Sequence, residues 1–291
     1  MIKAKHVKFQ NSQLPRSGFD MIKLQTLYQR VDLDHSISDN HIVEFYILLL
    51  ILEGTGTHTV DFKEYKYGPG SVFTIRKDQI QKFHPNATTK GFLLLFTNEF
   101  LVSFFQAHES QKTEQLFNEL LGSPHLVLNK KRFLKTKKQL KRIKEEYFVE
   151  RDDHSLAIIR SELQILIARL FRIKSKEENT LHSHKHLASF IKFQRMVEQN
   201  ATNKHRVQEY AQQLGVSTKS LNKITQTTIH KSAKEFLDEV HLKQIKRLLI
   251  NSKASIKEIA YQVGFDEPSN FYKFFKRHTK QTPEQFRSEL Q

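Results

Sequence analysis

Lysine, arginine and amide side chains gather around two short helical patterns near the C-terminal end of this 291-residue chain. Asparagine can pair with adenine and lysine can donate to guanine, whereas cations and hydroxyl groups suit phosphate oxygens. The side chains expected to contact bases are Lys219, Asn222, Lys223, Ser269, Asn270, Tyr272 and Lys273. Those expected to contact phosphates are Ser217, Thr218, Lys231, Lys276 and Arg277. The residue types therefore predict a surface that binds DNA through two helices.

These side chains belong to an internal repeat of a small residue, a glycine and an apolar residue. The first copy contains Ala211, Gly215 and Leu221, and the second contains Ala260, Gly264 and Phe271. The small residue lets two helices approach, the glycine ends the first helix at positive φ, and the apolar residue anchors the second helix. Ser217 is placed to cap one second helix, and Pro268 suits the first turn of the other. The repeat predicts two helix-turn-helix motifs, and the alternative is a helical bundle without a ligand.

The composition favours an anionic partner. The formal net charge is +16 and the isoelectric point is near 9.8, which suits an anionic polymer or surface. Residues 187–291 carry 18 Lys/Arg and 10 Asp/Glu, against 29 and 21 in residues 1–186. The absence of cysteine excludes disulfides and thiolate metal sites. The longest apolar run, Phe45 to Leu52, is too short for a membrane helix, and the N-terminus lacks the apolar segment of a secretory signal. We expect a soluble cytoplasmic protein with no membrane partner.

Residues 1–110 have the pattern of a β domain. Short apolar or alternating runs are separated by turn residues, which is typical of an antiparallel sandwich or barrel. The separating residues are Gly54, Gly56, Gly68, Pro69, Gly70, Pro85 and Asn86. The segment GFLLLFTNEFL predicts a further strand that leads into a helix.

Residues 111–174 have a helical pattern. Apolar residues recur at steps of three and four along its second half: Leu156, Ile159, Leu163, Leu166, Leu170 and Ile173. This spacing suits two helices that cover the β domain, and it equally suits a dimer interface formed by the first five of these residues. The polar residues 175–186 are the predicted linker, and their alternating histidines, His182, His184 and His186, are expected to be solvated.

The segment from Leu187 to Arg287 resembles the DNA-binding domain of the AraC family of bacterial transcription regulators. The matching residues are Ile259, Ala260, Gly264, Phe265, Ser269, Phe271, Phe275, Lys276, Thr282, Pro283, Phe286 and Arg287. The segments GTGTHTVDF, YGPGSVFTI and GFLLLFTNEFL are similar to the family's cupin-type sensor barrel. The resemblance implies an α+β chain of two domains. A cupin-like β-barrel with a helical dimerisation hairpin would precede an all-α domain, residues 187–291, with two helix-turn-helix motifs.

The resemblance also implies a function. Proteins of this layout bind a small effector in the barrel, form homodimers, bind a double-stranded DNA operator and control an operon, and RNA polymerase is a further candidate partner. Four residues depart from the family pattern: Thr225 and His241 replace Phe and Arg, and His230 and Lys280 replace glycine. His230 and Lys280 must therefore close their turns without the glycine that a left-handed backbone favours.

The competing interpretation is a cupin-type metal enzyme or binding protein with a basic tail that attaches to nucleic acid. Such a metal site needs two or three histidines and a glutamate that converge. The spacing of His41, Glu44, His58 and His84 does not give this set, and Val43 and Gln81 stand where sensor cupins often carry histidine. We therefore expect neither an enzyme nor a bound metal or cofactor. The candidate effector contacts are His41, Tyr46, Arg76 and His84.

Overall fold

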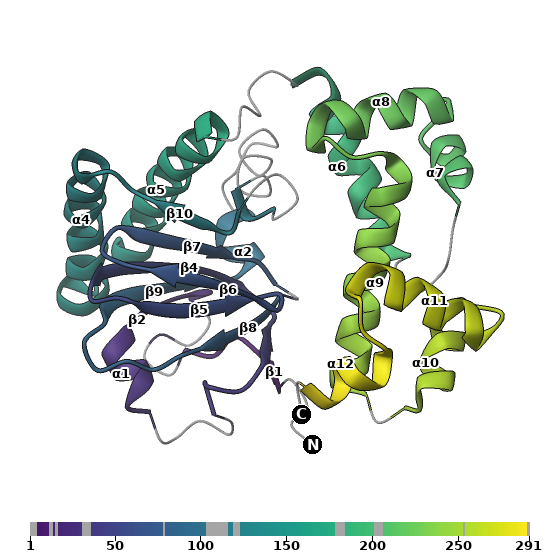
Figure 1. Ribbon diagram of the computed structural model, residues 1–291. Helices are drawn as coiled ribbons and strands as arrows, with labels where there is room; N and C mark the ends of the chain where they lie inside the picture. Colours follow the sequence, from purple (N-terminus) through teal and green to yellow (C-terminus); the bar gives the residue numbers. More distant parts are fainter. Residues whose placement is uncertain are drawn as a thin grey trace. The chain divides into compact units, whose positions relative to one another are not determined.

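The chain folds into two compact units. The computed structural model describes residues 5–11, 14, 17–30, 36–77, 79–102, 116–118, 123–177, 184–200, 206–252 and 254–289. One unit comprises Ala4–Asn179, and the other comprises Thr180–Gln291 together with Met1–Lys3 (Figure 1). Within the described ranges no helix is long and apolar enough to cross a membrane.

Two five-stranded sheets form the first unit (Figure 1). The strands are β1 (Lys5–Val7), β2 (Phe19–Lys23), β3 (His41–Val43), β4 (Tyr46–Glu53), β5 (Gly56–Val60), β6 (Lys63–Tyr67), β7 (Ser71–Ile75), β8 (Ile80–Phe83), β9 (Lys90–Phe96) and β10 (His125–Val127). One sheet has the order β1-β3-β8-β5-β6 and the other β10-β7-β4-β9-β2. The described strands of the two sheets do not pair with each other, so the sheets form a sandwich and not the closed barrel that was predicted. Strand β10, which pairs with β7, lies in the region predicted to be helical.

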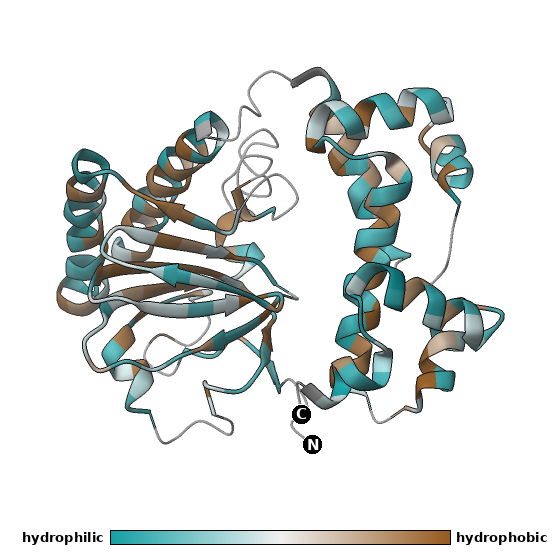
Figure 2. Ribbon diagram, viewed as in Figure 1, coloured by the Kyte–Doolittle hydropathy of each residue, from teal (hydrophilic) through white to brown (hydrophobic). Residues whose placement is uncertain are grey.

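Strand β4 is apolar from Ile47 to Leu52 because both of its faces are buried there. Leu48 and Leu50 belong to the core that the helices cover, whereas Ile47 and Leu49 belong to the core between the two sheets. Figure 2 shows the apolar colouring of β4. The predicted strand and helix near residue 96 are confirmed by β9 and by α2 (Asn98–Val102). A short helix, α1 (Leu24–Tyr28), was not predicted.

Two long helices cover the second sheet: α4 (Lys130–Glu145) and α5 (Ser155–Glu177), joined by the π-helical turn η2 (Glu146–Glu150). The residues predicted as a dimer interface lie on the inner face of α5. Ile159, Leu163, Leu166 and Leu170 have no exposed surface, and Leu156 packs against the same core. This corrects the prediction for Ile159, Leu163, Leu166 and Leu170, because the three-and-four spacing marks the face of α5 that covers the sheet, whereas Leu156 is only partly buried.

The second unit is helical. Its helices are α6 (His184–Gln199), α7 (Val207–Gln213), α8 (Thr218–Ile229), α9 (Ala233–Asn251), α10 (Ile256–Gln262), α11 (Pro268–Thr279) and α12 (Pro283–Glu289). Helix α9 lies between the α7–α8 pair and the α10–α11 pair (Figure 1). Phe193 of α6 packs against Phe236 of α9 and Tyr210 of α7, with ring centroids 5.2 and 5.6 Å away.

The predicted linker, residues 175–186, is partly helical. Helix α5 continues to Glu177, and α6 begins at His184 and includes His186. Residues 178–183, and with them His182, lie outside the described residues.

The burial of the α5 seam has a measurable consequence. Leu163→Ala should lower the free energy of unfolding by about 2–5 kcal/mol, because the change leaves a cavity between α5 and the sheet. Chemical denaturation would measure this. Val149→Ala is the control, because this apolar side chain of η2 is 69% exposed and its truncation should cost far less. Equal destabilisation by the two changes would contradict the assignment of Leu163 to the core.

Candidate functional site

The two turns of the repeat have the same hydrogen-bonded geometry. Gly215 has a φ of 68° and Gly264 a φ of 80°. In the first turn, Val216 N donates to Ala211 O at 3.0 Å, and in the second Phe265 N donates to Ala260 O at 3.0 Å. Each turn thus forms a Schellman motif, in which the glycine supplies the left-handed residue. Both helix-turn-helix predictions are confirmed in this local structure.

The second helix of each motif has one buried face and one exposed face. Leu221 of α8 and Phe271 and Phe275 of α11 have no exposed surface. The opposite face of α8 exposes Lys219 and Lys223. The same face of α11 exposes Ser269, Asn270, Lys273, Lys276, Arg277 and Lys280. Polar groups on one exposed helix face can reach base edges or phosphates in a groove of DNA.

Two of the predicted base-contacting residues bind within the protein instead. Asn222 Oδ1 accepts from Ala233 N at 2.9 Å, and Asn222 Nδ2 donates to Thr218 O at 3.1 Å. The Tyr272 hydroxyl donates to the carboxylate of Glu284. When Leu221 is aligned with Phe271, Asn222 and Tyr272 occupy the same position of the repeat. Each fastens its helix to the start of the next helix, so the structure gives both residues a positioning role that the sequence did not reveal.

The predicted phosphate contacts also divide into bound and free groups. The Ser217 hydroxyl accepts from Ser220 N at 3.1 Å and caps α8, as predicted. Lys231 forms an ion pair with Glu239, and Arg277 lies 3.6 Å from Asp238. Thr218 and Lys276 are exposed, and Lys276 has no ion pair in the part of the chain that the structure describes.

The two turns without glycine are left-handed, as predicted. His230 ends α8 with a φ of 57°, and Lys280 ends α11 with a φ of 65°. Thr225, at a position where the family usually has phenylalanine, is fully buried, and its hydroxyl donates to Asn222 O at 3.1 Å. The smaller anchor of the first motif therefore has a satisfied polar group in the core.

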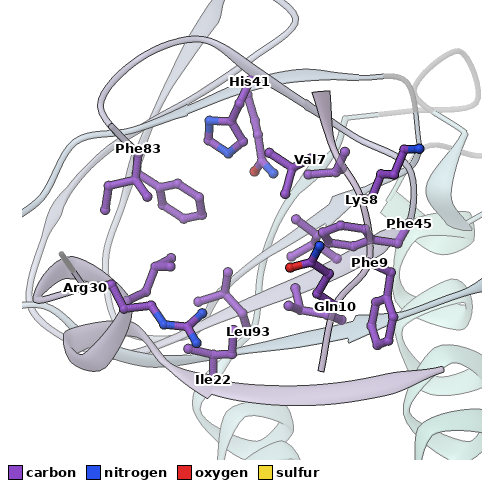
Figure 3. A pocket seen from close by; sticks show the side chains of 16 residues that line it. Val7, Lys8, Phe9, Gln10, Ile22, Arg30, His41, Phe45, Phe83 and Leu93 are labelled. Carbon is purple, nitrogen blue, oxygen red and sulfur yellow. The ribbon is translucent and has the colours of Figure 1, made fainter. Parts of the chain in front are cut away.

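The first unit contains a pocket of about 260 Å³ between its sheets (Figure 3). The pocket is lined by Val7, Lys8, Phe9, Gln10, Ile22, Leu27, Arg30, Ile37, His41, Val43, Phe45, Ile47, Gln81, Phe83, Leu93 and Leu95. Of the four predicted effector contacts, His41 lines this pocket. Tyr46 instead stacks on Phe96 on the helix-covered face of the sheet, with ring centroids 5.6 Å apart. Arg76 and His84 do not line the pocket.

A buried amide faces this pocket. Gln81 has no exposed surface, and neither of its amide atoms makes a hydrogen bond to a described residue. His41 Nδ1 lies 3.1 Å from Asp39 O, which orients the imidazole ring. Figure 3 shows the side chains of Arg30 and Gln10 pointing into the cavity. Neither residue has a periodicity or motif that could have marked it in the sequence.

His58 lies beside this pocket among aromatic rings. Its ring centroid is 5.0 Å from that of Phe73 and 4.7 Å from that of Phe83. Burial, together with the neighbouring histidines, lowers the pKa of His58 to about 3, although the nearby amide of Gln81 opposes this shift. The imidazole is therefore neutral at physiological pH. Among the residues that the structure describes, no group of three or more His, Asp and Glu could hold a metal ion.

Comparison with known proteins identifies both units. The AraC-like ligand binding domain matches residues 25–191, and a helix-turn-helix domain matches residues 210–289. The chain belongs to the AraC family. It is an AraC-type transcription regulator with a ligand-binding domain and a DNA-binding helix-turn-helix domain.

Several members of the family are similar over most of this chain. The Msm operon regulatory protein of Streptococcus mutans is 26% identical over 259 residues, which are 88% of this chain and 87% of that protein. The transcriptional activator RhaS of Escherichia coli is 23% identical over 251 residues, 85% and 86% of the two chains. A structure of ToxT from Vibrio cholerae with a bound unsaturated fatty acid has 19% identity and a TM-score of 0.43, covering 86% and 88%. The named relatives are transcription regulators, which is consistent with a protein that is not an enzyme.

The base and phosphate contacts predicted on the exposed face of α11 can be tested separately. Lys273→Ala should cost about 1–3 kcal/mol of binding and relax specificity at one base pair, because Lys273 is assigned to a base. Lys276→Ala should weaken binding to all sequences alike and reduce the salt dependence, because Lys276 is assigned to a phosphate. Selection of bound DNA from a random pool, with binding measured at several salt concentrations, distinguishes the two. Identical selected sequences and salt slopes for both variants would contradict these roles.

Proposed function

We propose that the pocket between the sheets is the effector site of this AraC-type regulator. The observation that carries this proposal is the buried Gln81, whose amide donor and acceptor make no hydrogen bond to a described residue and lie at a cavity with mostly apolar lining. An unsatisfied buried amide is unfavourable by about 1–3 kcal/mol. A ligand that hydrogen-bonds to Gln81 removes this penalty. Water is a poor substitute for such a ligand, because it does not fill the apolar part of the cavity favourably.

The pocket lining indicates the chemistry of the effector. Phe45, Ile47, Leu93 and Leu95 provide apolar walls. Arg30 supplies a cation on the lining, which favours a carboxylate or another anionic group. The proposed effector is therefore a small molecule with an apolar body and an acidic or strongly polar group. The cavity of about 260 Å³ is slightly smaller than the usual range for ligand pockets, which limits the effector to a compact molecule.

An amphiphilic anion can test the pocket without knowledge of the natural effector. Full-length protein should bind 8-anilinonaphthalene-1-sulfonate at one site, measured by fluorescence titration. Leu93→Trp should abolish this site because the indole fills the cavity, and Arg30→Gln should weaken it roughly tenfold through loss of a charge-assisted hydrogen bond.

Lys23→Gln is the matched control for Arg30→Gln, because Lys23 is an exposed cation that does not line the pocket. The control variant should bind as the wild type does. Unchanged binding by both Leu93→Trp and Arg30→Gln would place the ligand elsewhere.

The DNA-binding assignments complete the proposal. We assign base contacts to Lys219, Lys223, Ser269, Asn270 and Lys273, and phosphate contacts to Thr218 and Lys276. Asn222 and Tyr272 are assigned to positioning because their side chains are engaged within the protein. A chain with two recognition helices suits an operator with two elements about 34 Å apart, one turn of DNA. RNA polymerase is a further proposed partner.

Dimerisation is proposed through the outer face of α5. Ile158 and Ile165 lie seven residues apart on this helix and are 40% and 43% exposed. A spacing of seven places both side chains on one stripe, which is the pattern of a helix that packs against another helix. This stripe takes the place of the buried seam that the sequence indicated.

Ile165→Asp should convert a dimer to a monomer at micromolar concentration, because the interface would have to bury an unpaired carboxylate. Sedimentation equilibrium measures this change. Val149→Asp is the control, since Val149 is 69% exposed but lies on η2, away from the proposed stripe. Loss of the dimer in both variants, or in neither, would contradict the proposed interface.

A further inference from the structure

Helix α4 accounts for the net charge of the first 186 residues. Residues 1–186 contain 29 Lys/Arg and 21 Asp/Glu. Nine of these cations and one of these carboxylates lie among the 16 residues of α4. The other residues of this segment therefore carry 20 charges of each sign. The positive charge is concentrated on one helix of the ligand-binding unit, outside the helix-turn-helix domain.

Most of these cations face solvent without a carboxylate partner. Arg142 donates to both oxygens of Glu162, at 2.6 and 3.2 Å, and Lys141 lies 3.5 Å from Glu145. Five exposed lysines have no ion pair among the described residues: Lys130, Lys131, Lys135, Lys138 and Lys144. Figure 2 shows α4 as largely hydrophilic. The apolar residues Leu140 and Ile143 lie on the opposite face, in the core.

This arrangement of charge does not stabilise the helix itself. The first turn of α4 contains Lys130, Lys131 and Arg132 and no acidic residue, although the helix dipole disfavours cations at an N-terminus. Lys131 and Lys135 form a like-charged pair four residues apart, as do Lys137 and Lys141. Each such pair is unfavourable by about 0.2–0.5 kcal/mol in an isolated helix. An anionic partner would relieve all of these repulsions together.

We propose that the exposed face of α4 binds the phosphate backbone of DNA without reading its sequence. This contact is an addition to the helix-turn-helix motifs and does not depend on the proposed effector pocket. Lysine ammonium groups are point charges suited to phosphates, and no aromatic or amide side chain is exposed on the outer face of α4 to read a base.

The dimensions of α4 fit a duplex. A helix of 16 residues is about 24 Å long, and the same length of duplex presents about 14 phosphate charges. DNA held by the helix-turn-helix domain is bound to the same chain as α4, so the second contact benefits from a high effective concentration.

A lipid surface and an acidic protein are the competing partners. Leu134 is the large apolar side chain that α4 exposes, at 52%. An interfacial helix needs a wide apolar face to enter a membrane, and the apolar face of α4 is buried in the protein. DNA is the polyanion that this regulator already binds, whereas nothing in the structure points to an acidic protein.

The test measures binding of full-length protein to a 40-base-pair duplex of mixed sequence, a length of about four DNA turns. Lys130→Gln, Lys131→Gln and Lys138→Gln are combined in one variant. Loss of three phosphate contacts should make the slope of log K against log salt shallower by roughly 2.7. Affinity at about 0.1 M salt should fall at least tenfold. Fluorescence anisotropy of the labelled duplex supplies both quantities.

The control variant combines Lys66→Gln, Lys77→Gln and Lys82→Gln. It removes the same charge from the strands and a loop of the same unit, away from α4. Its slope and affinity should stay close to those of the wild type. The α4 variant should unfold at the same or a higher temperature than the wild type, because like charges have been removed, and this shows that weaker binding does not result from misfolding.

Three outcomes would overturn the proposal. Equal slopes for the two triple variants would mean that net charge alone matters. An unchanged slope for the α4 variant would mean that its lysines do not contact phosphates. If that variant keeps its DNA binding but fails to regulate transcription of a reporter, the partner of α4 is an acidic protein and not DNA.

Discussion

The two-sided burial of β4 is the constraint on which the ligand-binding unit depends. Alternate residues of this strand face opposite sides of the sheet. Ile47 and Leu49 point into the core between the sheets, and Ile47 lines the pocket. Leu48 and Leu50 pack in the core that α5 covers. One strand therefore forms a wall of the pocket and a platform for the helix.

In the DNA-binding unit, the two copies of the repeat share their backbone geometry more than their exposed side chains. The two turns share a Schellman motif, and Asn222 and Tyr272 hold the two recognition helices at the same repeat position. The two residues bind different groups. Ala233 donates its backbone N–H to Asn222, whereas Pro283, at the same position of the second copy, has no backbone N–H to donate. The exposed faces differ, with two lysines on α8 and a denser basic set on α11. Equivalent scaffolds thus present unequal surfaces, which allows the two motifs to contribute unequally to binding.

The positive charge of the chain is not confined to the DNA-binding unit. The helix-turn-helix unit has the expected basic surface, yet the whole excess of positive charge in residues 1–186 lies on α4. A helix that only covered a sheet would need an apolar inner face, and any polar residues would serve on its outer face. The outer face of α4 is instead rich in unpaired lysines that repel one another. Electrostatic binding of DNA can therefore extend beyond the motifs that give specificity.

Sequence by itself determined the features that depend on near neighbours in the chain. The glycine turns, the Ser217 cap and the apolar anchors Leu221 and Phe271 were predictable because each acts within a few residues of its own position. The same local patterns resemble those of a known family, and this resemblance predicted the two-domain organisation. The seam of α5 was ambiguous, because an apolar stripe of three-and-four spacing packs equally well on a sheet or on a second helix. Only the tertiary structure assigned that stripe to the sheet. It alone also assembled the pocket, since Gln10, Arg30 and Gln81 come from separate segments that no periodicity connects. Interactions between distant segments depend on which surfaces pack together, and this packing is determined by the whole fold.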